Sequence, residues 1–181
     1  MPRGAYVHLK SGREERFQCA PGPAGWRYVA EGVDLAVDSR WRPARLQLGA
    51  GERVIRGGAL GRELLWVRDG VEHSAEALGF LGESPCFLVA VARSLGLEAG
   101  EFRDVPLVAF EGGSLAARTV RQRWTLVSVE EHATELGGLP VQQWAVTDLE
   151  TAEQEEFHLA GDVVLAAEGI ELASLESPPN L

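Results

Sequence analysis

Short runs of alternating apolar and polar residues dominate the sequence. Residues 33–38 and 44–48 show this alternation most clearly, on either side of a turn at 39–43. Successive side chains of a strand point to opposite faces, so the pattern predicts antiparallel strands with one buried face and one solvated face. Further strands are expected at 3–9, 14–19, 26–31, 52–57, 71–77, 101–110, 118–129, 139–148, 154–160 and 163–166. Residues 64–67 are apolar on both faces, which predicts a central or doubly covered strand.

One segment has a helical pattern instead. Ser84 and Pro85 predict an N-cap followed by proline at the first helical position, and Gly96 predicts a C-terminal cap. Between them, apolar side chains cover more than half of the helix circumference, so the sheet must wrap around the helix. The predicted fold is mostly β: a long antiparallel meander curled as a roll or half-barrel around one short helix at about 85–95.

The length of 181 residues suits one domain. We expect a single β-roll domain over residues 1–176 and a flexible tail over 177–181, where two prolines follow a serine. No apolar run approaches the ~20 residues that a membrane-spanning helix needs. No secretory signal is evident at the N-terminus, which predicts a cytoplasmic protein without membrane insertion.

The formal net charge of −10 repels phosphate backbones, which argues against nucleic-acid binding. The two cysteines, Cys19 and Cys86, are too few for a disulfide framework, and we expect both to be small buried apolar residues.

Catalytic chemistry has little support in the sequence. The four histidines are far apart and no zinc-binding spacing is present. Glu156 and His158 would share one face of a strand, which leaves a metal-dependent hydrolase as an alternative. No nucleophile motif or phosphate-binding loop is found. We therefore expect neither an enzyme, nor a bound metal, nor a cofactor.

The five tryptophans are the most informative residues that remain. Large aromatic side chains usually fill the core of a β-roll, but they can also line an apolar cleft between a helix and a curled sheet. On the second interpretation, the ligand-binding residues would be Trp66, Trp124 and Trp144, with Arg93 and Gln122 as polar partners.

Several short motifs between about 25 and 124 resemble the glycolipid-binding family of bacterial proteins, whose members fold as a spiral β-roll. The motifs are Asp38-Ser39-Arg40-Trp41, Trp66-Val67-Arg68-Asp69-Gly70, Phe80-Leu81-Gly82-Glu83-Ser84-Pro85, Arg93-Ser94-Leu95-Gly96-Leu97 and Arg121-Gln122-Arg123-Trp124. The sequence departs from the family pattern where Ser94 separates the arginine from the leucine and where Trp124 replaces a tyrosine. The C-terminal third is more similar to the lipoprotein-carrier half-barrels. The resemblance implies a roll that binds a glycolipid.

Together these patterns predict a non-catalytic cytosolic protein that binds an apolar or glycolipid-like small molecule. An alternative is a protein–protein interaction scaffold with no small ligand, for which the N-terminal segment 3–8 would be the pairing edge. A homodimer is compatible with either function.

Overall fold

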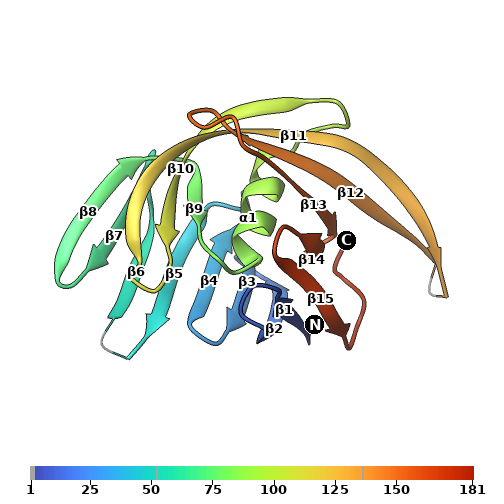
Figure 1. Ribbon diagram of the computed structural model, residues 1–181, viewed down its shortest axis with the longest axis horizontal. Helices are drawn as coiled ribbons and strands as arrows, with labels where there is room; N and C mark the ends of the chain where they lie inside the picture. Colours follow the sequence, from blue (N-terminus) through green and yellow to red (C-terminus); the bar gives the residue numbers. More distant parts are fainter. Residues whose placement is uncertain (1–2, 52, 136) are drawn as a thin grey trace.

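The computed structural model describes residues 3–51, 53–135 and 137–181 as one open sheet of 15 strands curled around one helix (Figure 1). This is the mostly β roll that the alternating sequence predicts. The helix α1 spans Cys86–Leu95. The strands are β1 (Arg3–His8), β2 (Arg13–Gly22), β3 (Gly25–Ala30), β4 (Val33–Asp38), β5 (Pro43–Ala50), β6 (Arg53–Leu60), β7 (Glu63–Arg68), β8 (Val71–Glu76), β9 (Gly79–Leu81), β10 (Phe102–Glu111), β11 (Ala116–Thr134), β12 (Gly137–Asp148), β13 (Gln154–Ala160), β14 (Val163–Ala167) and β15 (Ile170–Leu175).

The first strand, β1, lies in the middle of the sheet, and the next strands follow one another outward to one edge. The later strands start at the opposite edge and follow one another back to β1. From β1 the meander runs to β8 at one end, crosses to β9 at the other end, and comes back through β10–β15 to β1. Neighbouring strands are antiparallel except β9 and β10, which α1 separates in the chain. β1 therefore lies between β2 and β15. Our expectation that residues 3–8 form a pairing edge was wrong, because the last strand of the chain covers that edge.

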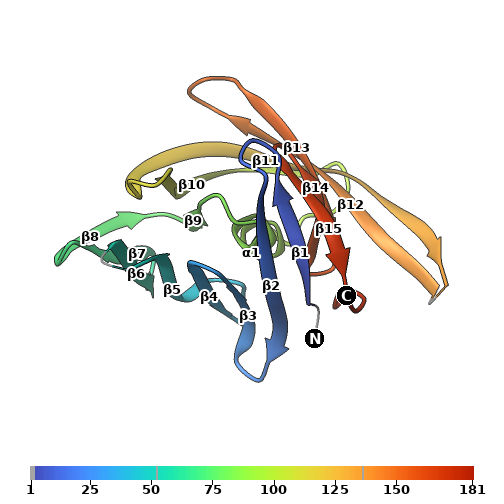
Figure 2. The same ribbon diagram turned by 60° about the horizontal axis from the view of Figure 1, so that its bottom comes forward.

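The sheet encloses α1 on its concave side (Figure 2). Seven of the ten helix residues are buried, including Cys86, and Gly96 ends the helix in the left-handed conformation that the sequence predicts. The start of the helix differs from the prediction. Ser84 does not cap it, because its hydroxyl donates a hydrogen bond to the buried Glu15 carboxylate. Within the described residues, the structure has no helix with the length and apolar character needed to cross a membrane.

β7 is not the central strand that residues 64–67 suggested. It lies next to the edge strand β8, and the outward-facing Val67 is 40% exposed. Single apolar side chains are common on protein surfaces, so an apolar run does not require a second covering layer.

The C-terminal tail, which the sequence predicts to be flexible over 177–181, contacts the rest of the molecule at Asn180. The backbone and side-chain amides of Asn180 donate hydrogen bonds of 2.8 and 2.7 Å to the carboxylate of Asp162. Asp162 is buried and also accepts a hydrogen bond from the indole of Trp26. A buried carboxylate needs such donors, and the tail supplies two of them.

On the outer face of the sheet, Asp34 on β4 connects three strands. Arg27 on β3 donates hydrogen bonds of 2.9 and 2.7 Å to its two oxygens, and Arg45 on β5 donates one of 2.7 Å. Chiefly through the hydrogen bonds from Arg27, and against the opposing effect of partial burial, the pKa of Asp34 lies below its ordinary value.

We expect Asp34→Asn to be less sensitive to acid than the wild type. A carboxylate with a lowered folded-state pKa contributes stability that is fully present above its unfolded pKa and is lost as the pH falls through its folded pKa. The variant should therefore lose about 1 kcal/mol of unfolding free energy at pH 7, and this difference should shrink below pH ~4. Urea titrations of both proteins at pH 7, 4 and 3 measure this difference in unfolding free energy. An undiminished difference at pH 3 would contradict the assignment.

Candidate functional site

A buried carboxylate, Glu15 on β2, is the centre of the most polar region inside the roll. Strand alternation places Glu15 on the same inward face as Phe17 and Cys19, and its side chain is 1% exposed. Its Oε1 accepts hydrogen bonds from the hydroxyls of Tyr28 on β3, at 2.8 Å, and Ser84, at 2.6 Å. The neighbouring strands β2 and β3 and the distant segment before α1 therefore meet at one carboxylate.

The second oxygen of Glu15 faces two basic side chains. Oε2 lies 2.9 Å from Nε2 of His8, at the end of β1, and 3.5 Å from the guanidinium of Arg13. Arg13 also lies 3.0 Å from Nε2 of His8. These contacts offset the cost of removing the carboxylate from water.

Burial, followed by the nearby charge of Glu15, raises the pKa of Tyr28 far above its ordinary value. The phenol therefore stays protonated at physiological pH, and its hydroxyl remains a hydrogen-bond donor to Glu15.

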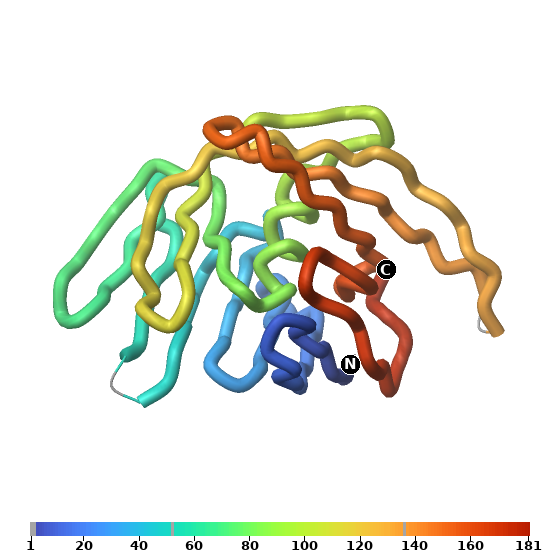
Figure 3. Tube along the Cα trace, viewed as in Figure 1, coloured from blue at the N-terminus to red at the C-terminus, as the bar shows by residue number. Residues whose placement is uncertain are grey.

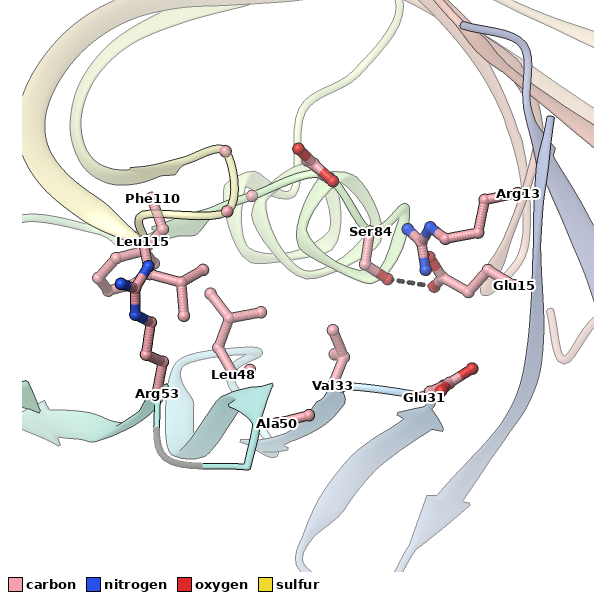
Figure 4. A pocket seen from close by; sticks show the side chains of 16 residues that line it. Arg13, Glu15, Glu31, Val33, Leu48, Ala50, Arg53, Ser84, Phe110 and Leu115 are labelled. Atoms are coloured by element: carbon pink, nitrogen blue, oxygen red, sulfur yellow. Dashed lines mark hydrogen bonds and ion pairs between the residues drawn. The ribbon is translucent and has the colours of Figure 1, made fainter. Parts of the chain in front are cut away.

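A pocket of about 530 Å³ opens beside this cluster (Figure 4). Arg13, Glu15 and Ser84 line its polar side. Across the pocket, Val33, Leu48, Phe110 and Leu115 form an apolar surface, with Arg53 beside Leu115 at its far end. The remaining lining residues include Glu31, Arg53 and Glu83, so neither sign of charge dominates its walls. The pocket thus combines an apolar wall with a hydrogen-bonding wall.

The tip of the β10–β11 hairpin forms one rim of this pocket. Leu115 adopts a left-handed conformation, with a φ of 51°, and lies close to Gly49 on β5. A β-carbon at Gly49, which has a φ of 98°, would come 2.2 Å from the backbone oxygen of Arg53 and 2.9 Å from a Leu115 methyl group, so the position requires glycine. The hairpin from one half of the sheet therefore packs against a strand of the other half.

The structure does not bring the predicted tryptophans together in one ligand site. Trp66 packs against Phe80 and Phe110, with ring centroids 6.5 and 6.2 Å away. Trp124 and Trp144 pack against each other at 6.1 Å and are both at least 98% buried. The two aromatic clusters are separate, because Trp66 on β7 meets rings from β9 and β10, whereas Trp124 and Trp144 lie on β11 and β12.

The predicted polar partners lie beside two smaller pockets. Gln122 accepts a hydrogen bond of 3.1 Å from the indole of Trp124, and both residues line a pocket of about 220 Å³. Arg93 stacks over Trp41, 5.1 Å from the ring centroid, and lines another pocket of about 240 Å³.

The residues considered for a metal site are exposed on β13. Glu156 accepts a long hydrogen bond of 3.4 Å from Gln143, and His158 points outward beside it. Among residues 3–51, 53–135 and 137–181, no group of three or more histidine, cysteine, aspartate or glutamate side chains is arranged to hold a metal ion.

Sequence reasoning missed the Glu15 cluster. Glu14 and Glu15 are adjacent in the sequence but point to opposite faces of β2, Glu14 outward and Glu15 into the roll. One signal was available: Glu15 is in phase with Phe17 and Cys19, so it had to face the core. Its partners His8, Tyr28 and Ser84 could not be assigned without the fold.

Comparisons with known proteins add information on the fold. No protein-family model matches the sequence, and no curated protein matches it. A solved structure of a DUF1089 family protein from Pseudomonas aeruginosa superposes with a TM-score of 0.59 at 20% sequence identity. The match covers 85% of this chain and 82% of that protein. The two proteins share a fold. At this level of identity, the similarity extends to the architecture alone.

Proposed function

We propose that the pocket beside Glu15 binds an amphipathic small molecule with an apolar chain and an uncharged, hydroxyl-rich head, as in a glycolipid. The observation that carries this proposal is the division of the pocket into two walls. Val33, Leu48 and Leu115 offer contact to an acyl or alkyl chain, while Arg13 and Ser84 offer hydrogen bonds to hydroxyl groups.

The size and charge of the pocket support the same ligand class. A volume of about 530 Å³ lies within the range of roughly 300–1,000 Å³ that is usual for small-molecule sites. The two arginines and three glutamates of the walls give a strongly anionic head no net attraction, and the net charge of −10 repels it. The sequence resemblance to a glycolipid-binding family favours the same class. We propose that this binding is non-catalytic and takes place in the cytoplasm.

We expect octyl β-glucoside, kept below its micellar concentration, to bind the purified protein with one site in isothermal titration calorimetry. Native mass spectrometry of freshly purified protein should also show a co-purifying amphiphile. Octyl sulfate, which has the same chain and an anionic head, should bind at least about tenfold more weakly, a difference of about 1.4 kcal/mol.

A matched pair of variants locates the binding. Gly113 lines the pocket, and a β-carbon there would meet open space, so Gly113→Trp should fill the pocket and abolish octyl glucoside binding. Gly22→Trp, at the end of β2, places the same side chain where a β-carbon also meets no close contact, and it should bind like the wild type. Binding that survives in Gly113→Trp, or the absence of binding in the wild type, would refute the proposal.

A further inference from the structure

The paired ends of β11 and β12 leave the sheet as a two-stranded arm, here defined, with the first turn residue, as residues 127–135 and 137–141. β10 pairs with β11 only as far as Thr125, and β13 pairs with β12 only from Gln142 onwards. Beyond these points, each strand pairs with only the other among the residues that the structure describes. Figures 1 and 3 show the arm extending from one end of the molecule.

The arm exposes apolar side chains and carries only negative formal charge. Val127 and Val129 are 43% and 46% exposed. Residues 127–135 contain three glutamates, among them Glu131 and Glu135, and no lysine or arginine. An isolated two-stranded ribbon is marginally stable in water, so an arm of this kind gains from a surface to pack on.

A surface of complementary character lies on β6 and β7, at the opposite end of the long axis (Figure 1). Residues 53–68 contain four arginines and one glutamate. On the outer face of these strands, Arg56 is the cross-strand partner of the exposed Val67. Arg62 follows the 67% exposed Leu60 in the connecting turn. In the described part of the chain, no ion pair within 4.0 Å involves either Arg56 or Arg62.

We propose that the arm docks on the outer face of β6 and β7 of a second copy of this chain, and that two copies form an antiparallel dimer through two such contacts. Val127 and Val129 would pack against Leu60 and Val67, and the arm glutamates would pair with the arginines. Because the arm and its acceptor face lie at opposite ends of one molecule, two copies placed side by side in opposite directions make both contacts at once. That arrangement has the closed two-fold symmetry most common among homodimers.

Charge reversal gives a decisive test. Arg56→Glu/Arg62→Glu makes both contact surfaces acidic, and Glu131→Arg/Glu135→Arg makes both basic, so each variant should repel its own copies. Mixed together, they restore opposite charges at both contacts. The readout is sedimentation velocity and light scattering over a range of protein concentrations, at one fixed salt concentration. The fixed salt matters because screening also weakens the general repulsion between two chains of charge −10.

The wild type should approach twice the chain mass of 19.6 kDa as its concentration rises. Each reversal variant alone should remain at 19.6 kDa, and an equimolar mixture should recover the dimer. The control variant is Lys10→Glu/Arg16→Glu, with substitutions on β2 and in the turn before it. It changes the net charge by as much as Arg56→Glu/Arg62→Glu does, and it should dimerise like the wild type. Circular dichroism confirms that each variant is folded. A monomeric wild type, reversal variants that still dimerise, or a mixture that stays monomeric would each overturn the proposal.

Discussion

Replacing Glu15 by alanine is expected to lower the free energy of unfolding by about 3–5 kcal/mol. The substitution removes one carboxylate but affects several partners. Tyr28 and Ser84 lose the acceptor for their buried hydroxyls, and His8 and Arg13 lose the nearby negative charge. Leaving buried donors without acceptors costs more than the net contribution of the hydrogen bonds themselves. Urea denaturation monitored by circular dichroism measures the change.

The neighbouring Glu14→Ala is the matched control for this prediction. Glu14 points outward from the same strand and pairs with the highly exposed Arg16. Its removal should change stability by less than about 1 kcal/mol. If Glu15→Ala were as stable as Glu14→Ala, the Glu15 cluster could not be an important part of the core.

The second large effect is expected for Trp124→Ala, with a loss of about 3–5 kcal/mol. Trp124 is fully buried, and it meets the rings of Trp144 and Phe157 edge-on, at 6.1 and 5.6 Å. Truncation would remove both contacts and leave a cavity between β11, β12 and β13. Thermal and urea unfolding should both show the loss.

Phe102→Ala provides the comparison for Trp124→Ala. Phe102 is 58% exposed and its main aromatic interaction is with the guanidinium of Arg123, 4.5 Å from the ring centroid. The Phe102→Ala substitution should lower the free energy of unfolding by less than about 1 kcal/mol. Equal effects of the two variants would contradict the assignment of Trp124 to the core.

Octyl glucoside binding by a folded Trp124→Phe variant would show that the tryptophan is not needed for the ligand.

The sequence predicted where the strands and the helix lie along the chain better than it predicted which strands pair with each other. Period-2 alternation located most strands, and the helix between Pro85 and Gly96 was correctly placed, because both signals depend on nearby residues. The position of β1 could not be found in this way. Its pairing with β15 depends on where the two ends of the meander meet, and no local pattern records that.

The candidate site was harder to predict for a related reason. Trp66 and Trp124 were predicted to border one ligand site, but they belong to separate clusters, and the pocket beside Glu15 lies elsewhere. Glu15 became conspicuous only when the fold placed hydroxyls from Tyr28 and Ser84 beside it. A charged residue in phase with apolar neighbours on a strand was the clue, and it deserves more weight than the count of aromatic residues.

The pairing of the first strand with the last has a consequence for biosynthesis. Gly4 pairs with Leu175, so one edge of β1 has no partner until β15, about 170 residues later, has left the ribosome. Contacts between such distant residues slow folding, because a long loop must close before the contact forms. During that interval β1 offers a free row of backbone donors and acceptors to other nascent chains. The rate at which β15 arrives therefore sets how long the growing protein is exposed to aggregation.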